Sequence, residues 1–150
     1  MKKKIFILGF ILSLILITGC TTSKSYTFKV ETNDSVEVTL NTTKNDYDIT
    51  STIPFTVKQN NKTISEGTFI KNEYYKTYIE AAKQDSNYKI IDSSSNNDIE
   101  YTFYSYNDSE YTHVINIKNS KTGVVLTNKI SEEKAKECFK LLTFKLKEWK

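Results

Sequence analysis

The 150-residue chain is poor in the residue types that build compact chemical sites: it has two cysteines, one proline, one histidine and four glycines, and no arginine. Two cysteines cannot form the disulfide framework that holds many small secreted domains together. A single histidine disfavours a zinc site, which needs several converging ligands. Four glycines without a glycine-rich run exclude a phosphate-cradling loop.

The absence of arginine also bears on possible partners. Arginine supplies bidentate contacts to phosphates and guanine, so its absence counts against nucleic-acid binding. The formal net charge is +3, and Lys2, Lys3 and Lys4 account for all of it, because the charge of the other 18 of the 21 lysines is balanced by 18 acidic residues. The pI of about 8.7 therefore belongs to the first few residues, and we expect no nucleic-acid partner.

The longest uncharged apolar run lies at the start of the chain, at residues 5–17, directly after three lysines. This run is shorter than the roughly 20 residues of an ordinary membrane-spanning helix. Its length is typical of the apolar core of a secretory signal, with the lysines on the cytoplasmic side. The sequence therefore predicts export across a membrane.

The end of this run, Ile17-Thr18-Gly19-Cys20, resembles a bacterial lipobox, in which an aliphatic residue and two small residues precede a cysteine. The resemblance implies that the Cys20 thiol receives a diacylglyceryl group and that the chain is cut between Gly19 and Cys20. Residues 1–19 would then be a removed signal peptide. Two acyl chains give stable anchoring where one gives marginal binding, so we expect a protein held by lipid at the extracytoplasmic face of the cell membrane.

The rest of the chain is predicted to form a linker and one domain. Residues 20–25 would be the lipidated N-terminus with a short polar linker, and residues 26–150 a single domain. Apolar and polar residues alternate in several runs, which predicts β-hairpins with turns at residues 33–34, 60–61 and 107–109. Asparagine in these turns suits their left-handed backbone.

The hairpin around residues 107–109 has a predicted register. A three-residue turn places Phe103 opposite His113, and Tyr101 opposite Ile115, on one apolar face. Tyrosines are frequent around this hairpin, which is typical either of a half-buried sheet or of a binding patch. They are Tyr101, Tyr104, Tyr106 and Tyr111.

Two helices are predicted from apolar residues at helical spacing. The first would follow an N-cap at Asn72 and end near Asp85, and the second would follow an N-cap at Ser131 and extend to about Lys145. Strands, a helix, more strands and a second helix are typical of an α+β domain. We expect an antiparallel β-sheet of about seven strands with two helices packed on it.

Local features around these helices accompany the order of elements. Gly67-Thr68-Phe69 precedes the first helix, and Thr122-Gly123-Val124 leads to Ser131-Glu132-Glu133 and Phe139 in the second. Together they resemble the PsbP/DcrB-like superfamily. The resemblance implies a protein that binds or supports protein assemblies and has no shared catalytic residues; fold likeness alone does not define a function.

The sequence contains no recognisable catalytic grouping, and we assign no catalytic, cofactor-binding or metal-binding residue. His113 and Cys138 are the one pair that could serve as base and nucleophile, but both fall on apolar faces, which favours core positions. Two carboxylate groupings lack the spacing of a calcium loop and are interpreted as loop residues: Asp46 with Asp48, and Asp92 with Asp98 and Glu100.

Two functions remain open from the sequence. The leading hypothesis is a membrane-anchored lipoprotein whose domain binds or supports another envelope protein without catalysis. The alternative is a small surface-anchored hydrolase that uses carboxylates or the Cys138–His113 pair.

Overall fold

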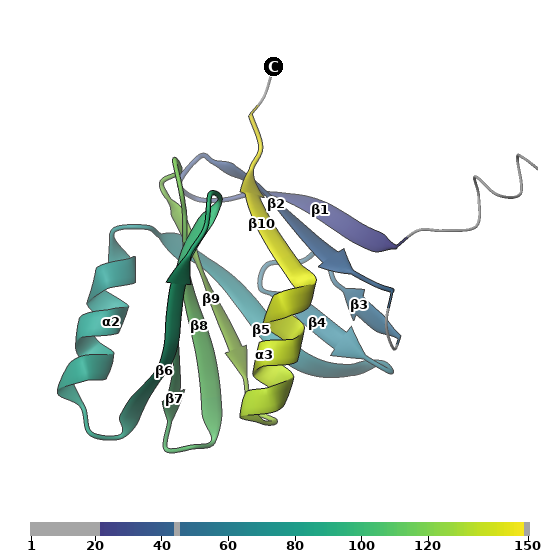
Figure 1. Ribbon diagram of the computed structural model, residues 1–150. Coiled ribbons are helices and arrows are strands. Elements are labelled where there is room, and N and C mark those ends of the chain that lie inside the picture. Colours follow the sequence, from purple (N-terminus) through teal and green to yellow (C-terminus); the bar gives the residue numbers. More distant parts are fainter. Residues whose placement is uncertain (1–21, 44–45, 149–150) are drawn as a thin grey trace, which may run out of the picture.

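The computed structural model describes residues 22–43 and 46–148. These residues form ten strands and two helices, and the strands make two antiparallel sheets (Figure 1). The predicted α+β class and the antiparallel sheet of seven strands are confirmed. The second sheet is an addition to the prediction. The leader, with the cleavage site Gly19 and the lipid-attachment residue Cys20, lies outside the described residues.

The smaller sheet combines the two ends of the domain. Its order is β1-β2-β10, with β1 at Ser23–Lys29, β2 at Ser35–Asn41 and β10 at Leu142–Leu146. Both neighbours run antiparallel to β2, which is therefore the central strand.

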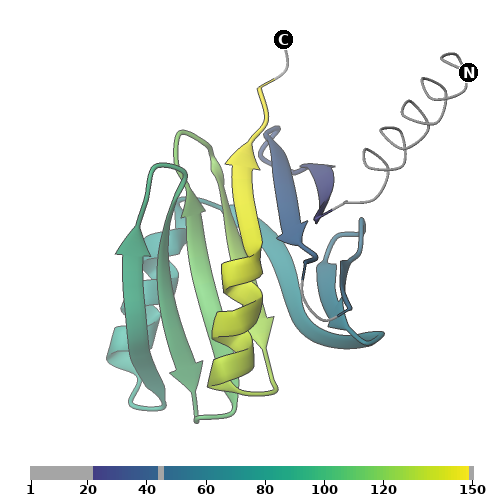
Figure 2. The same cartoon turned by 45° about the vertical axis from the view of Figure 1, so that its right-hand side comes forward.

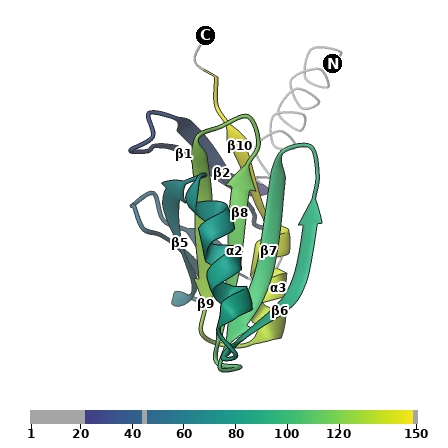
Figure 3. The same ribbon diagram turned by 90° about the vertical axis from the view of Figure 1, so that its left-hand side faces the viewer.

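The larger sheet has the order β3-β4-β5-β9-β8-β7-β6. Its strands are β3 (Tyr47–Ile49), β4 (Phe55–Gln59), β5 (Lys62–Lys71), β6 (Tyr88–Ser95), β7 (Ile99–Tyr106), β8 (Glu110–Ile117) and β9 (Thr122–Asn128). The helices are α2 (Tyr74–Gln84) and α3 (Glu132–Leu141). They lie on opposite faces of this sheet (Figures 2 and 3).

Each face of the large sheet has its own apolar cluster. The main core lies between this sheet, α3 and the small sheet, and it includes Phe55, Ile115 and Phe144, all at most 1% exposed. A smaller cluster lies beneath α2, where Tyr75 packs with Tyr104. Because strands alternate their side chains, both faces of β7 and β8 are covered.

The predicted register of the hairpin around residues 107–109 is confirmed. Phe103 pairs with His113 and Tyr101 with Ile115. The turns at residues 60–61 and 107–109 contain asparagines with positive φ, 51° at Asn60 and 50° at Asn107. The αL region costs asparagine little, so local sequence determines these turns.

The predicted linker at residues 20–25 is too long, because β1 begins at Ser23. The Ser25 hydroxyl lies 2.7 Å from that of Thr39 on β2, and Lys24 Nζ donates to Asp48 at 2.6 Å. The polar side chains of an edge strand can form hydrogen bonds with neighbouring strands, so a polar sequence does not by itself indicate a linker.

The second helix ends earlier than predicted. Helix α3 stops at Leu141, and residues up to Lys145, which we expected to be helical, belong to β10. Phe144 pairs with Val38 of β2 and is 1% exposed. Beyond Leu142 the apolar residues alternate instead of following the helical period, so the local pattern is ambiguous, and pairing with a strand about a hundred residues away makes this segment a strand.

The first helix also begins later than predicted. Helix α2 starts at Tyr74, with Glu73 in the N-cap position and no side-chain cap. The Asn72 amide instead donates to the Ser120 carbonyl at 2.6 Å, outside the helix. Asparagine meets its hydrogen-bonding needs equally well in a turn contact as in a cap.

Candidate functional site

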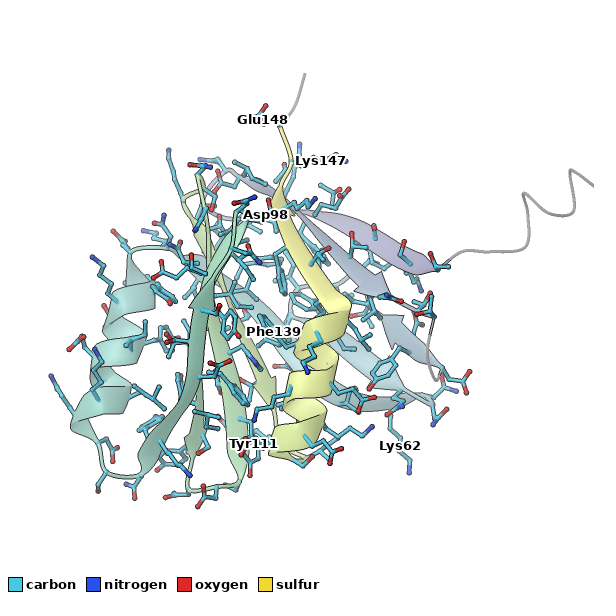
Figure 4. The ribbon with its side chains drawn as sticks, viewed as in Figure 1. Lys62, Asp98, Tyr111, Phe139, Lys147 and Glu148 are labelled. Carbon is cyan, nitrogen blue, oxygen red and sulfur yellow. The ribbon has the colours of Figure 1, made fainter. Side chains whose placement is uncertain are left out.

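His113 is held between two phenylalanine rings. Its ring centroid lies 4.0 Å from that of Phe103 on β7 and 4.1 Å from that of Phe139 on α3, with nearly parallel planes (Figure 4 labels Phe139). The side chain is 2% exposed. Burial lowers its pKa to about 3, so the imidazole is neutral near pH 7 and cannot meet a substrate from solvent.

Cys138 lies in the main core and is fully buried. Burial raises the pKa of its thiol to about 11, although a hydrogen bond with Ser65 acts in the opposite direction. A nucleophilic cysteine needs an accessible thiolate. The Cys138–His113 pair therefore lacks both the exposure and the ionisation that thiol catalysis requires.

Two of the carboxylates interpreted as loop residues, Asp48 and Asp92, lie instead on β3 and β6, where they make surface contacts. Lys24 holds the pKa of Asp48 below its usual range through their hydrogen bond. Asp92 accepts a hydrogen bond from the Tyr101 hydroxyl at 2.9 Å. Within residues 22–43 and 46–148 there is no group of three or more His, Cys, Asp or Glu residues that could hold a metal ion.

The tyrosines around the β7–β8 hairpin divide between the two faces of the sheet. Tyr104 is 6% exposed and packs in the cluster beneath α2. Tyr101 packs against Phe139 of α3 on the opposite face, with ring centroids 4.6 Å apart. The hydroxyl of Tyr111 donates to the Asp108 carbonyl. Sheet packing, one of the two interpretations left open, accounts for most of these rings.

A groove of about 440 Å³ lies beside the end of β5 and is the best candidate for a binding site. We call it the β5 groove. Its lining comes from the end of β1 and the chain after it, from the turn before β4, from β5 and from the start of α2: Lys29, Val30, Glu31, Thr32, Ile53, Thr68, Phe69, Ile70, Lys71 and Tyr74. Two large apolar side chains at its margin are unusually exposed, Ile53 at 52% and Tyr74 at 47%.

The groove exists because β4 is shorter than β5. The pairing of β4 with β5 ends where Phe55 meets Gly67. Strand β5 continues to Lys71, paired on its other side with β9 as far as Thr122. Residues 68–71 therefore have no neighbouring strand on the β4 side, and the groove follows that free edge.

One side of the groove, the β1–β2 turn with Thr32, is held by a polar network. The Asp34 carboxylate accepts hydrogen bonds from the Lys121 N–H and the Thr122 hydroxyl, both at 2.7 Å. The Thr32 hydroxyl lies 2.5 Å from that of Thr122. These contacts tie the β1–β2 turn to the β8–β9 turn.

The sequence contains only weak signals for this groove. Ile53 and Tyr74 are isolated apolar residues next to turns, and single exposed apolar residues are common. What brings them together is the end of the β4–β5 pairing, which depends on contacts between strands.

A scan against models of protein families found no match, and searches of the curated proteins and of the solved structures found none either. The resemblances to a lipobox and to the PsbP/DcrB-like superfamily therefore stay predictions. Among the residues that the structure describes, no helix is both long and apolar enough to cross a membrane.

Proposed function

We propose that this protein is a lipid-anchored extracytoplasmic lipoprotein that binds another component of the cell envelope through the β5 groove. The observation that carries the proposal is the run Ile17-Thr18-Gly19-Cys20 after a basic start and an apolar core. The thiol of Cys20 is the group that would carry the lipid.

The position of β1 supports a domain held at the membrane surface. Strand β1 begins at Ser23, three residues after Cys20. A fully extended chain covers at most about 11 Å over three residues. Lys29, where the β5 groove begins, lies at the other end of β1, about 20 Å from Ser23, so a partner would meet the groove near the same membrane surface.

The burial of the two candidate catalytic groups favours binding over hydrolysis. His113 is enclosed between Phe103 and Phe139, and Cys138 is fully buried. The β5 groove is lined by lysine, glutamate, threonine and apolar residues, without histidine or cysteine. This combination of apolar and charged side chains suits recognition of a partner.

Recovery of a partner from intact membranes tests the proposal. A tagged full-length chain would be cross-linked in its own envelope and its partners compared with those of Ile53→Ala and Tyr74→Ala. We expect one reproducible partner that both variants lose. Tyr78→Ala is the matched control, because Tyr78 is 38% exposed on the same helix but does not line the groove. An unchanged partner set in the groove variants would contradict the proposal.

A further inference from the structure

The free edge of β5 carries backbone groups that no strand of the described chain satisfies. The Asn72 N–H donates to the Lys121 carbonyl at 2.9 Å, which marks a hydrogen-bonded position of the β5–β9 ladder. Such positions alternate along an antiparallel pair. Ile70 therefore bonds to β9, whereas the N–H and C=O groups of Phe69 and Lys71 are directed to the opposite side.

On that opposite side lies the β5 groove. Strand β4 pairs with β5 only as far as Phe55 and Gly67. Among the described residues, no backbone hydrogen bond outside the strand ladders involves Phe69 or Lys71. Their groups repeat about 7 Å apart along the strand, which is the repeat that an added β-strand matches.

The side chains around this edge define what could lie on it. Val30, Ile53 and Tyr74 provide an apolar wall. The charged residues that line the groove are two lysines, Lys29 and Lys71, and one carboxylate, Glu31. The lining therefore has an excess of positive charge that complements an acidic residue. Lys71 lies 3.9 Å from Glu73, but this pair is exposed and weak.

The other long edge of the large sheet is less suited to strand addition. Strand β6 contains an irregularity between Ile90 and Asp92, where its register with β7 shifts. Bulges and charged residues on edge strands discourage pairing with other chains. The free part of β5, in contrast, keeps a regular register with β9 up to Lys71.

We propose that an extended peptide segment of the partner, apolar at alternate positions and acidic at one end, adds as a strand to residues 68–71 of β5. This inference rests on the proposed binding function and specifies the chemical class of the partner. Main-chain hydrogen bonds to Phe69 and Lys71 would provide register, and the apolar wall would select side chains.

A proline at position 71 tests the backbone part of this proposal. Lys71→Pro removes an N–H that is not used by β9, and proline is tolerated on a free strand edge. Lys71→Ala is the matched control, because it removes the same charge and keeps the N–H. The probe is the fluorescein-labelled peptide Glu-Val-Thr-Val-Thr-Val-Glu, which carries an acidic residue at each end so that either strand direction can place one beside the lysines. It is titrated by anisotropy against the full-length chain in detergent micelles.

We expect Lys71→Pro to bind the peptide at least about tenfold more weakly than Lys71→Ala, with equal thermal unfolding temperatures. Two N-methylated forms of the peptide provide a second measurement that needs no protein variant. One is methylated at the odd-numbered residues and the other at the even-numbered residues. One should bind like the parent and the other should lose binding, because only alternate N–H groups of a strand face its neighbour. Absence of parent-peptide binding, equal binding by the two variants, or equal binding of the two methylated peptides would overturn strand addition.

These outcomes separate this inference from the proposed function. Partner recovery from membranes with a failed peptide titration would remove strand addition and keep the binding function. A positive titration with no partner in membranes would keep strand addition at β5 and remove the proposed function in the envelope.

Discussion

Gly67 is the residue whose replacement tests the packing of the main core most directly. A Cβ atom added there would lie 2.5 Å from both Cε atoms of Phe55 and closer still to Cζ. The Phe55 ring is fully buried and packs against Phe28 and Phe69, each with ring centroids 5.7 Å away. Gly67→Ala must therefore displace a ring that has little room to move.

The expected cost can be estimated from two opposing effects. Overpacking a core costs about 1–3 kcal/mol, and partial loss of the Phe55 contacts adds to it. Alanine also reduces the entropy of the unfolded chain, which offsets about 0.4–1 kcal/mol. We expect Gly67→Ala to lower the free energy of unfolding by about 2–3 kcal/mol, measured by urea denaturation followed by circular dichroism.

Two further variants make this prediction specific. Thr68→Ala, at the exposed neighbouring position, should change stability by no more than about 0.5 kcal/mol. In a Phe55→Ala background the obstacle is gone, so Gly67→Ala should cost less than about 1 kcal/mol. Equal costs of Gly67→Ala in the two backgrounds would refute the proposed clash with the Phe55 ring.

Three other predictions follow from buried polar groups. The pKa of His113 is about 6.5 in the unfolded chain and about 3 in the folded chain, so the stability from this group is present above pH 6.5 and is lost as the pH falls towards 3. We expect the free energy of unfolding to be about 2 kcal/mol lower at pH 5 than at pH 8. His113→Phe should remove that part of the pH dependence of urea unfolding. Asn128 is 2% exposed and donates to the Ile64 carbonyl at 2.6 Å, so Asn128→Ala should cost about 2–3 kcal/mol in the same assay, and a loss below 0.5 kcal/mol would contradict the role of this contact. Cys138 should react with iodoacetamide at least a hundredfold more slowly in the folded chain than in urea, because its thiol is buried and its pKa is raised to about 11; rapid labelling of the folded chain would revive the hydrolase alternative.

The hairpins could be predicted because their determinants are local. Asparagines with positive φ, such as Asn60 and Asn107, define the turns, and the alternation of side chains defines the register. The start of α3 is equally local, since the Ser131 hydroxyl accepts a hydrogen bond from the Lys134 N–H at 3.1 Å. These features need no knowledge of distant segments.

The parts that could not be predicted depend on distant segments. Phe144 is part of a strand because it pairs with Val38, and the residues around it fit a helix or a strand equally well until that partner is known. The β5 groove depends on where Phe55 and Gly67 end the β4–β5 pairing. Neither strand shows in its own residues where its neighbour stops, so the candidate binding site was not predicted.

Attachment of lipid to Cys20 is the central claim, and mass spectrometry of the N-terminal peptide from membrane-extracted protein tests it most directly. The lipoprotein proposal predicts a chain that begins at Cys20 and carries a diacylglyceryl group. Cys20→Ala provides the control and should leave the chain unmodified and uncut. An unmodified Cys20, or an intact Met1 terminus in the membrane-extracted protein, would contradict the claim.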